Sequence, residues 1–221
     1  MVERICPKCK IPMNADVCVK KSCHIKTVMS TTLYWCEECN VPTFEPVCPK
    51  CGTEGKYIST DIRPVFPEER LLLALVQGKE NPHCYENSSV WYGSGVYIID
   101  GKKEKISITE INKWPLDKIK AIKEDYDRLS DSIDSSYFDS NVAVFVEVNK
   151  ERYNYITEEA MRFVSSYRDQ YAVEDMMVSF SGGKDSTVTS HIVNSALGTN
   201  KVLHIFGDTT LEFPTTLEYK K

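Results

Sequence analysis

The sequence predicts an α/β chain with three parts: a cysteine-rich ribbon that binds metal, a small α+β middle domain, and the first βαβ unit of a doubly wound parallel sheet. Three observations support this prediction. Eight of the nine cysteines lie between Cys6 and Cys51, in closely spaced pairs. Helical and strand patterns mix from residue 61 onward. Near the C-terminal end, a glycine-rich loop separates a short apolar run from a helical pattern.

Composition excludes several classes of protein. With 221 residues and 42% apolar side chains, the chain can bury cores, which argues against disorder. The longest uninterrupted apolar run, residues 71–76, is far shorter than the roughly 20 residues of a membrane span. The N-terminus lacks the apolar segment of a secretory signal. We therefore expect a cytoplasmic protein without a membrane partner, and its net charge of -5 offers no overall field for a polyanion.

Domain boundaries follow changes in composition. We predict a zinc-ribbon module at residues 1–60, where proline, glycine and cysteine replace long apolar runs. A small α+β domain is predicted at 61–140, and the N-terminal part of a parallel-sheet domain at 141–221. The middle domain should begin with a helix that starts at Pro67 and stops at Gly78.

The rest of the middle domain is expected to hold strands and a second helix. Strands are predicted at residues 89–92 and 96–99, and the Asp-Gly pair at 100–101 predicts a hairpin turn that leads to a strand at 106–108. Apolar residues at helical spacing follow Pro115 and extend to Leu129.

The third domain is expected to begin after a polar linker at residues 130–140. Residues 142–148 then suggest a strand or an extended lead-in, and Asn149 is expected to cap a helix that runs to about Tyr171.

A βαβ unit follows that helix. Its strands are predicted at residues 176–180 and 201–206, joined by a helix at 186–197 that Gly198 ends. A strand, a helix and a strand within about 31 residues form one βαβ unit, which implies parallel strands and a right-handed crossover.

The cysteine pairs indicate two tetrahedral metal sites, because thiolates on tight turns are the ligands of structural zinc. Sequential pairing would give two structural Zn²⁺ ions, whereas a cross-braced pairing satisfies the same valence. We adopt the sequential arrangement, with His24 as an alternative ligand to Cys23; iron–sulfur clusters and free thiols are the other possibilities. The proposed ligands of the first site are Cys6, Cys9, Cys18 and Cys23, and those of the second are Cys36, Cys39, Cys48 and Cys51.

The ribbon has two interpretations. It acts either as a metal staple that replaces a core or as a surface that contacts tRNA, DNA or a protein partner. Residues 1–60 hold eight Lys or Arg against six Asp or Glu, and two Zn²⁺ ions with eight thiolates leave a net charge of about -2. This slightly negative net charge favours the interpretation of the ribbon as a metal staple over a nucleic-acid contact.

The glycine loop predicts an anion site, because it connects a strand to the N-terminus of a helix. Its two glycines allow close approach to phosphate oxygens, its serines donate hydrogen bonds, and its lysine adds positive charge. The carboxylate in the loop would repel bound phosphates unless it caps backbone amides or helps to hold Mg²⁺. The loop is neither a Walker A motif nor a dinucleotide fingerprint. The predicted phosphate-binding residues of the loop are Ser181, Gly182, Gly183, Lys184, Asp185 and Ser186.

The string 181–186 resembles the PP-loop of the adenine nucleotide alpha hydrolase superfamily, and residues 206–219 resemble the second signature of its phosphoadenosine phosphosulfate (PAPS) reductase branch. The resemblance covers residues 149–221, with Thr210 where the family commonly has glycine. It implies PAPS or ATP as ligand, and it places Asp208 and Glu212 near the nucleotide. The zinc module and middle domain resemble, more loosely, an N-terminal extension of archaeal-type members.

The resemblance implies two kinds of chemistry: a reductase or sulfotransferase reaction at the phosphosulfate, or cleavage of the nucleotide between its α and β phosphates. Alternatives are an ATP-using component that modifies tRNA or DNA with sulfur, and a non-catalytic scaffold that binds nucleotide. The family's reductases use a C-terminal cysteine, but no cysteine follows Cys84 here. Cys84 itself is not expected to be a nucleophile, because adjacent residues in a strand point to opposite sides and His83 would face away. No catalytic residue is therefore assigned.

We expect the chain to be a piece of a longer domain and inactive alone, because two parallel strands with one crossover helix leave a sheet face uncovered. Apolar surface on Met177, Phe180, Leu203 and Ile205 should then face water. A second chain that completes the sheet is the corresponding partner.

Overall fold

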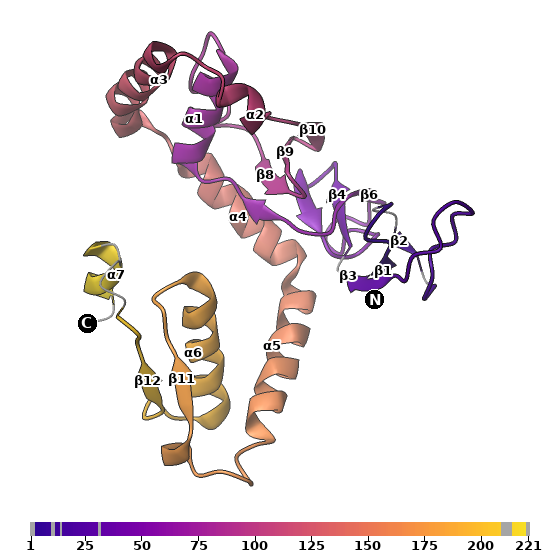
Figure 1. The fold of residues 1–221 in the computed structure, drawn as a ribbon. Coiled ribbons are helices and arrows are strands. Elements are labelled where there is room, and N and C mark those ends of the chain that lie inside the picture. The colour runs from indigo at the N-terminus through magenta and orange to yellow at the C-terminus, as the bar shows by residue number, and fades with distance from the viewer. Residues whose placement is uncertain (1–2, 10–11, 14, 31, 209–213, 220–221) are drawn as a thin grey trace. The chain divides into compact units, whose positions relative to one another are not determined.

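The computed structural model describes the chain except residues 1–2, 10–11, 14, 31, 209–213 and 220–221 (Figure 1). It divides into two compact units, Met1–Lys150 and Glu151–Lys221, which are described separately below. The finer division into three domains remains a prediction. Among the described residues, none of the helices combines the length and the apolar character that spanning a membrane requires.

The described residues of the first unit form three antiparallel sheets. One has the order β2-β1-β3, the next has the order β5-β4-β6, and the third has the order β10-β9-β8-β7. The strands are β1 (Glu3–Ile5), β2 (Pro12–Met13), β3 (Val28–Ser30), β4 (Leu33–Cys36), β5 (Val41–Thr43), β6 (Lys56–Ser59), β7 (Arg63–Pro64), β8 (Val90–Gly93), β9 (Val96–Ile99) and β10 (Lys102–Glu104).

Helix α1 (Pro67–Gln77) has the bounds that its start and stop signals predict. Proline occupies its first turn, and Gly78 ends it in the left-handed conformation at φ 66°. The predicted helix after Pro115 is confirmed as α3 (Leu116–Leu129). A short helix α2 (Ile108–Ile111) precedes it, capped by the Ser107 side chain.

The hairpin after β9 differs from the prediction. Asp100 and Gly101 both have positive φ, at 46° and 79°, which is a two-residue turn of the type that joins adjacent strands directly. The return strand therefore begins at once as β10, with Lys102 opposite Ile99. The strand predicted at 106–108 was wrong, because the ladder is complete by Glu104 and Ile108 begins α2.

The linker at 130–140 and the strand at 142–148 were also wrong. After a single turn of 3-10 helix, η1 (Ser130–Ser132), these residues form helix α4 (Ser136–Val148). Asn141, Phe145 and Val148 recur at helical spacing, and they place one face of α4 against the sheets. Packing of this face overrides the β preference of the valine-rich run.

Trp91 belongs to one buried core of the first unit and is 1% exposed. Its ring packs 4.7 Å from that of Phe145, and its indole N–H donates to the Ser89 hydroxyl at 2.9 Å. The same hydroxyl donates to the buried Asn141 side chain at 2.9 Å. Leu33 and Ile98 join this cluster, so the β4 sheet and the β8 sheet share one core.

Asn149, which was predicted to cap the following helix, is the residue that ends α4. Its side chain accepts a hydrogen bond from the Phe44 amide and donates to the Pro42 carbonyl, at 3.0 Å each. These bonds attach the end of α4 to β5. The pairing depends on residues more than 100 positions apart, so local capping rules could not find it.

The second unit contains a βαβ unit, as predicted. Strands β11 (Met177–Ser179) and β12 (Leu203–Ile205) pair in parallel, and helix α6 (Lys184–Leu197) connects them (Figure 1). Gly198 ends α6 at φ 65°. Val178, Leu197 and Val202 form the small core. The other elements are helix α5 (Lys150–Ser165), the 3-10 turn η2 (Val173–Asp175) and helix α7 (Pro214–Tyr219).

Helix α5 ends at Ser165, six residues before the predicted end at Tyr171. The Ser166 hydroxyl donates to the Phe163 carbonyl at 2.7 Å, and the following amides bond three residues back in turns. Serine hydroxyls compete with the backbone for helix carbonyls in this way.

The open sheet face is confirmed for three of the four predicted residues. Met177, Leu203 and Ile205 are 65%, 58% and 45% exposed, because they alternate with the residues that face α6. Phe180 is half-buried instead and packs edge-on against His204.

Candidate functional site

The first candidate site is a group of four thiols in the N-terminal sheet region. The sulfur atoms of Cys6, Cys9, Cys18 and Cys23 all lie within 4.8 Å of one another. The Cys9 amide donates to Cys6 Sγ at 3.3 Å, which is how a tight turn orients a thiolate toward a metal. The exposed His24 lies outside this group, so the four cysteines form the set without it.

The second group repeats this arrangement with Cys36, Cys39, Cys48 and Cys51, which also lie within 4.8 Å of one another. The Cys39 amide donates to Cys36 Sγ at 3.3 Å. The Thr53 hydroxyl lies 3.2 Å from Cys51 Sγ and lowers the pKa of that thiol to about 6. Sequence reasoning missed Thr53, although its position two residues after the last ligand is a usable signal.

The spacing of the thiols tests whether a metal would fit. A tetrahedral ion with bonds of about 2.3 Å to sulfur places its ligands about 3.8 Å apart. The measured distances are 3.6 Å for Cys6–Cys23 and 4.0 Å for Cys9–Cys18. In the second group they are 3.4 Å for Cys36–Cys51 and 3.8 Å for Cys39–Cys48. The donor sets fit zinc, and sequential grouping is confirmed over cross-bracing.

Cys9 and Cys36, one in each group, are poor acids when no metal is bound. Hydrogen bonding with Cys23 is the main cause that raises the pKa of Cys9 to about 12, and burial is the main cause that raises the pKa of Cys36 to about 11. These thiols therefore keep their protons near neutral pH until a divalent cation displaces them.

We therefore expect metal loading to release protons and metal affinity to fall as pH falls. Titrating a chromogenic chelator against the loaded protein between about pH 5.5 and pH 8 measures this dependence. Retention of both ions with unchanged affinity across this range would show that the thiols do not hold the metal.

The second group is built into the core of the first unit. Cys36 and Cys48 are buried and pack against Val41 of β5 and Val148 of α4. Outside this core, Lys50 of the second turn forms an ion pair with Glu147 of α4 at 2.6 Å. A metal at this site would therefore organise the packing of α4 as well as the ribbon.

The third candidate site is the loop from Ser181 to Ser186 in the second unit. Gly182 has φ 75°, a conformation that favours glycine, and Gly183 occupies the position just before α6 with no side chain to cap the helix. The first amides of α6 are therefore available to an anion, as at other helix N-termini. The Ser181 hydroxyl donates to the Ser186 hydroxyl at 3.2 Å, which closes the loop.

The charged residues of the loop point into solvent. Side chains of Lys184 and Asp185 are 88% and 92% exposed, and their charged atoms are 3.9 Å apart. Asp208 follows β12 and is exposed. Because β11 and β12 are parallel, the loop and Asp208 both follow carboxyl ends of strands and lie at the same edge of the sheet. Glu212 and Thr210 lie outside the described residues.

The remaining titratable candidates have structural surroundings. Cys84 packs against the core of the first unit, and burial raises the pKa of its thiol, which opposes nucleophilic reactivity. The neighbouring His83 bonds to Glu86 at 2.7 Å instead. His204 is hydrogen-bonded to Ser190 at 2.7 Å and to the Val202 carbonyl at 2.8 Å, so it is a partly buried residue with satisfied ring nitrogens.

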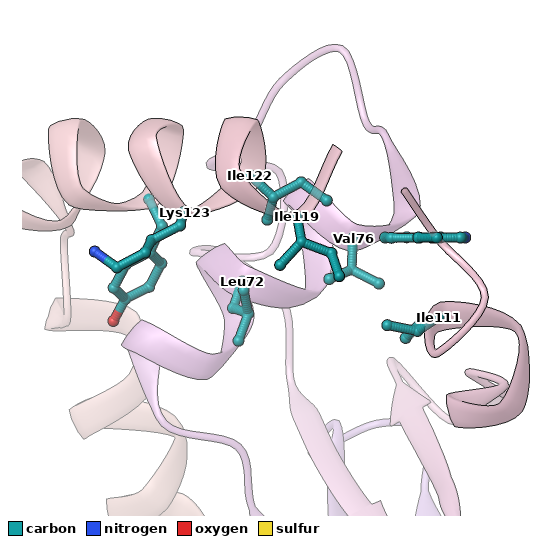
Figure 2. Close-up of a pocket in the computed structure, with 8 residues that line it drawn as sticks. Leu72, Val76, Ile111, Ile119, Ile122 and Lys123 are labelled. Atoms are coloured by element: carbon teal, nitrogen blue, oxygen red, sulfur yellow. The ribbon is translucent and has the colours of Figure 1, made fainter. Parts of the chain in front are cut away.

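An apolar pocket of about 260 Å³ lies between α1, α2 and α3 in the first unit. Figure 2 shows Leu72, Val76, Ile119 and Ile122 lining it from the two longer helices. The only charged lining residue is Lys123, which is ion-paired with Asp127. Because most of the described lining residues are aliphatic or aromatic, the pocket offers little to orient a reacting substrate.

Comparison with known families matches residues 175–221 to the phosphoadenosine phosphosulfate reductase domain. No curated protein and no solved structure matched the chain. The matched segment contains β11, the glycine loop, α6, β12 and Asp208. For this segment the match supports a PAPS reductase-like family. The PP-loop superfamily assignment and the nature of residues 1–174 stay predictions.

Proposed function

We propose that residues 175–221 bind the phosphate or phosphosulfate end of an adenine nucleotide, PAPS or ATP. The observation that carries this proposal is the match to the PAPS reductase domain over a segment whose glycine loop leaves a helix N-terminus open. An anion at this position would gain the α6 amides and the helix dipole together.

Each loop residue has a role in this proposal. Gly182 and Gly183 let the backbone approach the phosphate oxygens, and the Ser181 and Ser186 hydroxyls would donate to them. Lys184 would move from solvent to the phosphates. Asp185 and Asp208 would hold Mg²⁺ or cap backbone amides, and Glu212 belongs to the same proposed set.

The proposed chemistry follows from where negative charge develops. Cleavage at the phosphosulfate or between the α and β phosphates would leave an anion at the loop, where the amides and Lys184 would stabilise it. The proposed activity is that of a reductase or transferase acting on PAPS, or of a nucleotide alpha hydrolase. We propose structural zinc for both thiol groups, because their spacing and ligand type suit a closed tetrahedral site.

The test is nucleotide binding by calorimetry, with PAPS, adenylyl sulfate and ATP compared in the presence and absence of Mg²⁺. Gly183→Val should weaken binding at least about a hundredfold, because the valine would occupy the space of the phosphate oxygens. The ligand-free fold should tolerate it, since φ is -83° and an added Cβ meets only Ser181 Oγ at 3.5 Å.

A matched pair of lysine variants tests the charge. Lys184→Met should weaken binding about tenfold, whereas Lys201→Met removes an equal charge before β12, at the opposite edge of the sheet, and should change it less than about twofold. Unchanged affinity in Gly183→Val, or equal losses in both lysine variants, would refute the loop assignment. The ligand that binds most tightly identifies the nucleotide.

A further inference from the structure

The two thiol groups sit on repeated scaffolds whose charges are opposite. Residues 1–32 hold six Lys or Arg against two Asp or Glu, and residues 33–60 hold two against four. A zinc ion with four thiolates has a charge of -2. The first ribbon, residues 1–32, therefore has a net charge of about +2, and the second ribbon, residues 33–60, has a net charge of about -4. The near-neutral average over residues 1–60 hides this difference.

The turns that carry the thiols differ in the same way. In the first ribbon, Lys8 lies between Cys6 and Cys9, and the Lys20–Lys21 pair lies between Cys18 and Cys23. The first turn of the second ribbon, between Cys36 and Cys39, carries Glu37 and Glu38. Both scaffolds need the turns for their thiols, so the exposed residues between the thiols are free to serve another purpose.

The geometry brings the lysines of the first ribbon together. The four sulfurs of this group lie within 4.8 Å of one another, so the turn with Lys8 and the turn with Lys20 and Lys21 meet at one end of the ribbon. All three lysines are exposed. Lys26 is also exposed and follows the second turn, where it bridges to Val17.

These lysines lack the partners that neutralise the second ribbon. Among the described residues, no carboxylate pairs with Lys8, Lys20, Lys21 or Lys26. In the second ribbon, both lysines are paired, Lys50 with Glu147 and Lys56 with Glu37. The lysines of the first ribbon are therefore exposed positive charges that no carboxylate among the described residues neutralises, and they are available to an external anion.

We propose that the first ribbon binds the phosphate backbone of a nucleic acid through Lys8, Lys20, Lys21 and Lys26, while the second ribbon is a structural staple. Charge complementarity supports this partner, because the rest of the chain has 21 Lys or Arg against 30 Asp or Glu and would repel a polyanion elsewhere. A nucleic acid presents phosphates at regular spacing and can therefore engage several lysines of one small surface at once. The inference concerns a site separate from the glycine loop.

The experiment measures fluorescence anisotropy of labelled single-stranded RNA, single-stranded DNA and duplex DNA with the zinc-loaded full chain, at several salt concentrations. Lys8→Gln/Lys20→Gln/Lys21→Gln should weaken binding at least about tenfold near 0.1 M salt. It should also reduce the slope of log affinity against log salt by about two for single strands, since each phosphate contact contributes about 0.7. Comparing the three nucleic acids distinguishes RNA from DNA as the source of the phosphates.

The matched control is Lys102→Gln/Lys105→Gln/Lys120→Gln, which makes the same charge change at exposed residues outside the ribbon. It should retain affinity and salt slope within about twofold of the parent. Metal content must equal two ions in both variants, so that loss of the ribbon fold is not mistaken for loss of contact. The proposal would be overturned if the parent did not bind at 50 mM salt, which is the result expected if the ribbon contacts a protein instead. Equal losses of affinity in both variants would also overturn it.

Discussion

Replacing Cys48 with serine is expected to remove one of two zinc ions and to unfold residues 33–60. Cys48 is 1% exposed and packs against Val41 and Val148, so its loss removes a ligand and disturbs the core together. Binding of a structural zinc ion is worth about 10–16 kcal/mol, which exceeds the stability of most small domains. The remaining three thiolates are not expected to hold the second ribbon.

Metal analysis and tryptophan fluorescence measure this result. The zinc content should fall from about two to about one ion per chain, and emission should shift to the red as Trp35 and Trp91 meet water, because both belong to the core beside the ribbon. Cys84→Ser is the control, since Cys84 lies outside both thiol groups, and it should keep both ions. Iron with visible absorbance, or unchanged metal content in Cys48→Ser, would contradict the assignment.

Replacing Arg70 with methionine is expected to lower the free energy of unfolding of the first unit by about 3 kcal/mol or more. Arg70 is 2% exposed, and its guanidinium donates to the carbonyls of Val65 at 2.8 Å, Ser88 at 2.8 Å and Tyr85 at 3.3 Å. Methionine keeps much of the apolar contact with Phe138 but leaves the Val65 and Ser88 carbonyls without the donor that Arg70 supplies. The Tyr85 carbonyl still accepts from the Ser88 amide at 3.3 Å.

Urea denaturation of the zinc-loaded chain, followed by tryptophan fluorescence, measures this loss. Arg128→Met is the matched control, because the Arg128 side chain is 68% exposed on α3 and its ion pair is with Asp125, three residues earlier. Its effect should stay within about 0.5 kcal/mol, as for most exposed helix pairs. A loss below about 1 kcal/mol in Arg70→Met would show that water satisfies the carbonyls that lose the Arg70 donor.

Local chemistry determined much of this fold. Proline at the start of α1, Gly78 and Gly198 after helices, and the Asp100–Gly101 turn each act through their own backbone preferences, so sequence patterns located them. The cysteine spacing likewise predicted two thiol groups, because four ligands on two tight turns have few ways to meet. The glycine loop was also located from local patterns, because a strand-like run precedes it and a helical pattern follows it.

Other features depended on residues distant in the sequence. The run at 142–148 has a strand-like composition, yet it is helical because Asn141, Phe145 and Val148 face the cores beside β4, β5 and β8. The attachment of Asn149 to β5 and the burial of Arg70 are equally invisible to local rules.

The charge difference between the two ribbons could be counted from the sequence, but its meaning came from the tertiary structure. Only the fold reveals that Lys50 and Lys56 have carboxylate partners while the first ribbon's exposed lysines have none among the described residues. The sequence by itself therefore determined the turns, the helix ends and the ligand sets, whose energies are local. Tertiary structure decided which faces are buried and which charges are neutralised, because those energies arise between segments that only folding brings together.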